Sequence, residues 1–133
     1  MTIPVRFGSG FRLHDGNNMD NVAANPQWQQ NPAVTAVAGA LSSSTPVLLL
    51  GINVVTTTPS TGGVVLPSGI LGGIVHVRNS GSNTLTVFAA GSDTIDTTAG
   101  STGVTIAAGK SAIFFGYATT GKGVDSWTQF QSA

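Results

Sequence analysis

The sequence contains no cysteine and no glutamate, and only 8% of its 133 residues are charged. The lack of cysteine excludes disulfides and thiolate metal sites, so the stability of the fold rests on core packing, to which contacts between subunits can add. Five lysines and arginines balance five aspartates, and the basic residues form no cluster. Because nucleic-acid binding is driven by cations that neutralise phosphates, we expect no nucleic-acid partner.

Long apolar runs are also absent. The longest, VLLLGI at 47–52, is far shorter than the roughly 20 residues that a membrane-spanning helix requires. Near the N-terminus, Pro4 and Arg6 interrupt the stretch in which a signal peptide would need its apolar core. We therefore expect a soluble protein that is made in the cytoplasm and has no membrane partner.

The weak charge of the chain bears on its association. Net charge keeps protein copies apart in solution, and here the formal net charge is zero. Hydrophobic residues make up 41% of a chain that is too small to bury all of them. The composition therefore predicts a homo-oligomer.

From Ala33 onward, short runs rich in Val, Ile and Thr alternate with turns in which Gly, Pro, Asn or Asp cluster. We predict strands at 34–38, 46–57, 63–66, 73–78, 84–89, 103–107, 111–117 and 126–131. No helical pattern is long enough to connect parallel strands, which favours antiparallel pairing. The expected fold class is all-β, an antiparallel β-sandwich or jelly roll with an extended N-terminal arm.

The stretch GGIVHVRNSGSNTLTVFAAGSDTI at 72–95 shows the pattern most clearly. Apolar residues occupy alternate positions of two runs, as in strands with one buried face: Val75, Val77, Leu85 and Val87. The turn residues NSGSN at 79–83 lie between the runs and predict an antiparallel hairpin. The exposed face of this hairpin would carry His76, Arg78, Thr84 and Thr86.

The first 32 residues hold four of the ten charges and differ from the rest of the chain. We predict an N-terminal arm or lead-in at 1–32 and a β-sandwich domain at 33–133. Large apolar side chains in the arm are expected to contact a partner or a neighbouring subunit, because each would cost roughly 1.5 to 3 kcal/mol if left exposed. These candidate contact residues are Phe7, Phe11, Leu13 and Trp28.

Residues able to support catalysis are few. His14 and Asp15 are adjacent, which in a strand sends them to opposite faces, so they do not form a base and its orienting carboxylate. No serine lies in a G-x-S-x-G motif. We therefore predict no enzyme activity, no catalytic residues and no cofactor.

Metal binding and sugar binding are the two other chemistries that the residues offer. Asp93 and Asp96 offer oxygens to calcium, but the EF-hand spacing is missing, and such a pair in a turn is more often a turn cap. His76 has no second and third metal ligand that the sequence identifies. Trp28 and Trp127 have the rings that stack on sugars, although a single Trp on a last strand more often packs at the edge of the core. We expect no metal site, and sugar binding remains the alternative.

Between about residues 50 and 131, the order of turn and core residues resembles a module of tailed-bacteriophage virion proteins. In that module an Asn-Val run leads to a Leu-Pro turn and then to a strand ending in V-x-N-x-G-x-N-x-L-x-V. A Gly-turn-Ile follows, and then an Ala-Gly turn with a Ser before an aromatic strand and a terminal Trp. The residues that occupy these places are Leu66, Pro67, Val77, Asn79, Gly81, Asn83, Leu85, Val87, Gly91, Ile95, Ala108, Gly109, Ser111, Phe114 and Trp127.

The resemblance implies a small structural protein of the virion, either a capsid decoration (cement) protein or a head-fibre component, commonly a homotrimer. It implies that the partners are other copies of the chain and the major capsid protein, on the capsid surface, after synthesis in the host cytoplasm. The alternative is a receptor- or glycan-binding module of a phage tail or head fibre. Such a module presents exposed aromatic pairs or a polar pocket, whereas a reinforcing protein has apolar contacts at subunit seams.

Deletion of residues 1–13 is expected to weaken oligomerisation and to leave the β-fold intact, because Phe7, Phe11 and Leu13 would lose their contacts with the neighbour. Sedimentation velocity and far-UV circular dichroism of the truncated protein measure the two effects separately. Unchanged assembly would refute a contact role for these residues.

Overall fold

The computed structural model describes residues 29–68, 72–118 and 125–133. These residues form eleven β-strands and no helix, and hence no apolar helix that could cross a membrane. The strands are β1 (Gln30–Thr35), β2 (Val37–Ala38), β3 (Gly51–Thr57), β4 (Gly62–Val65), β5 (Ile74–Asn79), β6 (Leu85–Phe88), β7 (Thr94–Ile95), β8 (Thr98–Ala99), β9 (Val104–Ile106), β10 (Ser111–Ala118) and β11 (Asp125–Gln131). The expectation of an all-β fold is confirmed.

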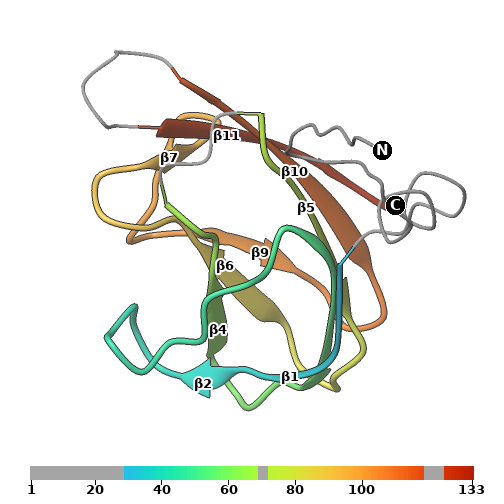
Figure 1. Cartoon of the computed structure of the whole chain (residues 1–133). Coiled ribbons are helices and arrows are strands. Elements are labelled where there is room, and N and C mark those ends of the chain that lie inside the picture. The colour runs from blue at the N-terminus through green and yellow to red at the C-terminus, as the bar shows by residue number, and fades with distance from the viewer. Residues whose placement is uncertain (1–28, 69–71, 119–124) are drawn as a thin grey trace, which may run out of the picture.

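The strands form two sheets that share one hydrophobic core (Figure 1). The larger sheet has seven strands in the order β1-β3-β5-β10-β11-β7-β8, and the smaller has four in the order β2-β4-β6-β9. Both sheets supply fully buried side chains to the core, among them Val55, Val77, Phe114 and Trp127 from the larger sheet and Val64, Leu85, Val87 and Ile106 from the smaller. Trp127, expected at the edge of the core, lies within it.

Both sheets are mixed, so the expectation of purely antiparallel sheets is wrong. β3 pairs in parallel with β1 and β5, β4 with β6, and β7 with β11. A parallel pair needs a connection of a dozen or more residues, which is usually helical. Here a strand of the opposite sheet takes that place, because β4 lies between β3 and β5 in the chain, and β5 lies between β4 and β6. The lack of a long helical pattern therefore does not exclude parallel pairing in this fold.

The predicted hairpin at 72–95 is also wrong, because its two strands belong to different sheets. β5 pairs with β3 and β10, whereas β6 pairs with β4 and β9. The turn residues at 79–83 carry the chain from one sheet to the other instead of pairing its two flanks. The four alternating apolar residues are nevertheless all fully buried, as predicted: Val75, Val77, Leu85 and Val87.

Asn79 ends β5 at this crossing, and its side chain is fully buried. Its Oδ1 accepts hydrogen bonds from Thr58 Oγ1 at 2.9 Å and from the Gly81 N–H at 3.1 Å. Its Nδ2 donates to the carbonyls of Asn83 at 2.8 Å and Ile106 at 3.0 Å. One amide therefore joins the end of β3, the β5–β6 connection and β9. At Gly81 a Cβ would lie 2.7 Å from the Thr58 nitrogen, so the close approach requires glycine.

A second buried amide explains why the strand predicted at 46–57 begins only at Gly51. The side chain of Asn53 accepts from the Leu49 N–H at 3.0 Å and donates to the Leu49 carbonyl at 2.8 Å, and both groups are thus withheld from strand pairing. Gly51 follows with a φ of 104°, a conformation that favours glycine. Before it, only Val47 makes an isolated bridge, to Val65. The two-residue strands β7 and β8 were not predicted, because two residues show no periodicity.

Replacement of Asn79 by Ala is expected to lower the free energy of unfolding by about 2 to 4 kcal/mol, because buried donors and acceptors would lose their partners. Ser82→Ala, in the same connection at an exposed position, is the control and should change stability by no more than about 0.5 kcal/mol. Urea unfolding followed by tryptophan fluorescence measures both. Equal stabilities of the two variants would contradict a structural role for the amide.

Candidate functional site

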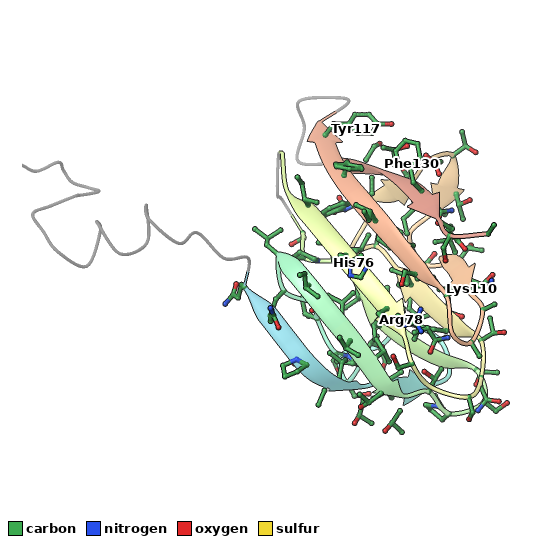
Figure 2. All side chains as sticks on the ribbon, turned by 90° about the vertical axis from the view of Figure 1, so that its right-hand side faces the viewer. His76, Arg78, Lys110, Tyr117 and Phe130 are labelled. Carbon is green, nitrogen blue, oxygen red and sulfur yellow. The ribbon has the colours of Figure 1, made fainter. Side chains whose placement is uncertain are left out.

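One face of the larger sheet points away from the core and carries mostly apolar side chains (Figure 2). We call it the outer face and define it by Ile52, Val54, Ile74, His76, Arg78, Ser111, Ile113, Phe115, Tyr117, Thr128 and Phe130. These residues alternate along β3, β5, β10 and β11 with residues that point into the core or toward the smaller sheet. Each of these strands therefore has apolar residues on both of its sides.

Strand register places four outer-face residues in one row. Ile52 of β3 is opposite His76 of β5, His76 is opposite Ile113 of β10, and Ile113 is opposite Phe130 of β11. Directly opposite side chains lie about 5 Å apart at Cβ, so the row is contiguous. His76 thus lies between two isoleucines near the middle of the outer face.

Aromatic side chains stand on the β10–β11 part of the outer face. The rings of Phe115 and Phe130 meet edge to face, with centroids 5.9 Å apart and an interplanar angle of 75°. Phe130 is 64% exposed, Tyr117 44% and Phe115 37%. Large contiguous patches of exposed apolar side chains are rare on monomeric proteins and usually mark an interaction site.

The cations near the outer face lie at one end of it (Figure 2). Arg78 donates a hydrogen bond to the Gly109 carbonyl at 2.6 Å, and the Lys110 ammonium donates to the carbonyl of Ala133. Tyr117 lies at the opposite end. Among the residues that the structure describes, His76 is therefore the only titratable side chain in the middle of the outer face.

His76 is half-buried, and its Nδ1 has no hydrogen-bond partner among the described residues. Burial, and to a smaller extent the positive charge of Arg78, lower the pKa of His76 below its ordinary value of 6.5. The imidazole is therefore neutral at neutral pH. As a result, the middle of the outer face carries no charge under those conditions.

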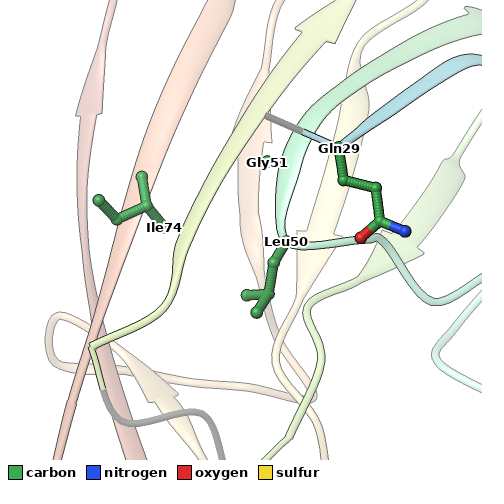
Figure 3. Close-up of a pocket in the computed structure, with 4 residues that line it drawn as sticks. All are labelled: Gln29, Leu50, Gly51 and Ile74. Atoms are coloured by element: carbon green, nitrogen blue, oxygen red, sulfur yellow. The ribbon is translucent and has the colours of Figure 1, made fainter. Parts of the chain in front are cut away.

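Two hollows adjoin the outer face. One, of about 270 Å³, is lined by His76, Ser111, Ile113 and Phe130 among others. The other, of about 360 Å³, is lined by Gln29, Leu50, Gly51 and Ile74 (Figure 3). This second hollow shares Ile74 with the outer face and lies where the described chain enters β1. We call it the rim hollow.

The residues predicted to contact a partner, Phe7, Phe11, Leu13 and Trp28, lie outside the described residues, and their role stays a prediction. His14 and Asp15 also lie outside the described residues. His76 and Arg78 lie on an outward face, as the alternation predicted. Trp127 is fully buried and presents no ring to a sugar.

The possible calcium ligands are in different environments. Asp93 is buried, whereas Asp96 is exposed, has a φ of 52° and accepts a hydrogen bond from Thr128 Oγ1 at 2.7 Å. Among the described residues, no group of three or more His, Asp or Glu side chains is placed to hold a metal ion.

Sequence reasoning did not single out the outer-face residues of β10. The run SAIFFGYA at 111–118 does carry the signal, since Ile113, Phe115 and Tyr117 fall on one side of a strand whose other side holds Phe114. A strand that is apolar on both sides is typical of a sheet that is covered on both faces, so the side that does not meet the core is expected to meet another surface.

Comparisons of the chain with protein-family models, with curated proteins and with solved structures found no match. The function is therefore inferred from the outer face itself.

Acidification is expected to destabilise the protein through His76. Its pKa is lower in the folded state, so the unfolded state binds more protons, and stability is lost as the pH falls through 6.5 and below. Melting temperatures between pH 7.5 and 5 should fall more steeply for the parent than for His76→Gln, which retains His14 and every carboxyl group. Parallel curves for the two proteins would show that His76 is not responsible.

Proposed function

We propose that this chain is a structural protein that assembles as a homo-oligomer through its outer face and decorates or reinforces a bacteriophage capsid. The observation that carries the proposal is the outer face: a four-stranded apolar surface that no described part of the chain covers. The two sheets around one core support a β-sandwich as the architecture of the subunit.

The composition of the outer face suits a contact between subunits. Interface cores are depleted in charge and enriched in aromatic residues and other large apolar groups. Here the outer face carries three aromatic side chains, three isoleucines and one neutral histidine, and the cations lie at one end. Burial of such a surface gains roughly 25 cal/mol for each Å² of apolar area removed from water.

The capsid as the setting is proposed from the resemblance to phage virion modules, which also suggests a trimer. In the structure, the residues that carry this resemblance include core residues such as Phe114 and Trp127 and the crossing residues Asn79 and Gly81. These core and crossing residues stabilise the fold and do not form a binding surface. The resemblance therefore bears on the type of fold, and we propose that the outer face supplies the contact surface.

Binding of a receptor or glycan is the second candidate, and the exposed pair Phe115 and Phe130 with Tyr117 favours it. Against it, the two Phe rings meet edge to face and do not form one flat platform for a sugar ring. A hollow lined by hydroxyl and amide side chains, about 370 Å³ in volume, is formed instead around the smaller sheet by Ser60, Thr61, Asn83, Thr84 and Thr86. The aromatic and polar groups that a sugar site combines are therefore on different sheets.

Phe130→Asp is expected to dissociate the oligomer to the 13.4 kDa subunit without unfolding it, because position 130 is 64% exposed in the single chain and would be buried on assembly. Sedimentation velocity gives the mass, and circular dichroism reports the fold. Thr84→Asp, at an exposed position beside β6 of the smaller sheet, introduces the same charge and should stay oligomeric.

A parent protein that sediments only as a 13.4 kDa species would contradict the proposed assembly. So would a Phe130→Asp protein that keeps the parent mass. Retention of the parent on an immobilised glycan, lost in Phe115→Ala, would favour the second candidate instead.

A further inference from the structure

We propose that the segment before Gln29 of one copy lies over the outer face of a neighbouring copy. This inference rests on the proposed assembly, and it names the occupant of the outer face. It is carried by the uncovered face, by the point at which the described chain begins, and by the sequence of residues 1–28.

The described chain begins at the edge of the outer face. Gln29 lines the rim hollow together with Leu50 and Ile74, and its carbonyl accepts a hydrogen bond from the Ile52 N–H at 2.9 Å (Figure 3). Leu50 is 39% exposed in this hollow. The 28 preceding residues are therefore tethered beside the apolar surface that needs a cover.

The length of the segment is sufficient. An extended chain spans about 3.3 Å for each residue, which gives 28 residues a reach on the order of 90 Å. Neighbouring strands are about 4.8 Å apart, so the outer face from β3 to β11 is only about 15 Å wide. The segment can cross the outer face and still extend to an adjacent copy.

The beginning of the segment has the apolar period of a strand. From 3 to 13, every odd position except Ser9 is a large apolar residue: Ile3, Val5, Phe7, Phe11 and Leu13. The even positions hold small or polar residues, including Arg6 and Arg12. A strand of this pattern has one apolar side to place on a flat apolar sheet, and its arginines fall on the opposite side.

The later part of the segment complements the charge near the outer face. Residues 14–28 contain Asp15 and Asp20 and no Lys or Arg. The charged residues at the end of the outer face are the cations Arg78 and Lys110. An apolar part followed by an acidic part thus matches an apolar sheet with a basic end.

The neighbouring copy is favoured as the receiver because of the proposed assembly. If copies meet through their outer faces, a segment that covers one of these faces lies between two subunits and contacts both. Exchange of a terminal segment between identical copies is a low-cost route to a closed oligomer. The same contacts then cover the apolar surface and hold the copies together.

Because the chain has no cysteine, two single thiols test the proposal directly. Ser9→Cys marks the one odd position between 3 and 13 without a large apolar residue, and Ser111→Cys marks the outer face beside His76. Both changes replace one oxygen by sulfur. Ser43→Cys, exposed in the β2–β3 connection, is the control acceptor.

The two single variants are mixed, allowed to exchange subunits, and treated with a short bis-maleimide reagent. We expect several-fold more cross-link between the two chains when Ser9→Cys is mixed with Ser111→Cys than when it is mixed with Ser43→Cys. Mass spectrometry identifies the cross-linked products. A double variant Ser9→Cys and Ser111→Cys that links only within one chain would overturn the exchange between copies.

Sedimentation velocity of the same samples separates the inference from the proposed assembly. An oligomer in which Ser9→Cys links no better to Ser111→Cys than to Ser43→Cys would overturn the inference and leave the assembly standing. A monomer that forms no cross-link between chains would overturn both.

Discussion

The crossing of the chain from one sheet to the other is the constraint on which the rest of this structure depends. At each crossing the backbone leaves the hydrogen-bond ladder of one sheet before it joins the other, so its polar groups need other hydrogen-bond partners. At the β5–β6 crossing, Asn79 supplies these partners with a single side chain that bonds to Thr58, Gly81, Asn83 and Ile106. Where the chain enters β3, the Asn53 side chain likewise bonds to the backbone N–H and carbonyl of Leu49. Because the chain alternates between the two sheets, strands of the same sheet can then pair in parallel without a helical connection.

The same arrangement leaves the outer face uncovered. The smaller sheet shares a core with one side of the larger sheet, and no described element lies on the other side. A helical connection would have covered such a side, as helices do in most parallel sheets. Because strands replace helices here, the apolar residues on the outward side of β3, β5, β10 and β11 need a cover from elsewhere. The low charge of the chain and its uncovered outer face both favour the association that we propose.

His76 shows how this surface responds to its surroundings. Its imidazole lies between Ile52 and Ile113, and burial already disfavours its charged form in the single chain. Removal of the remaining water by a partner would disfavour the charged form further. His76 would therefore become harder to protonate as a partner covers the outer face, and the proposed assembly would favour the neutral imidazole.

Much of the burial was predictable from the sequence, and little of the pairing was. Alternation in β5 and β6 identified Val75, Val77, Leu85 and Val87 as core residues and placed His76 outward. It failed to show that the two strands lie in different sheets, because NSGSN at 79–83 has the residues of a tight turn whether it closes a hairpin or joins two sheets. The outer face was missed for a related reason, since a strand apolar on both sides does not reveal which side meets its own core.

The sequence by itself determined the all-β class, the positions of most strands and the buried side of β5 and β6. These follow from the period of two and from the turn residues, both of which act over a few neighbouring positions. Only the tertiary structure decided that β3 lies beside β5, that Ile52, His76, Ile113 and Phe130 form one row, and that this row is uncovered. Such neighbours come from segments dozens of residues apart, and their register is set by the crossings between sheets. No local pattern in the chain encodes it.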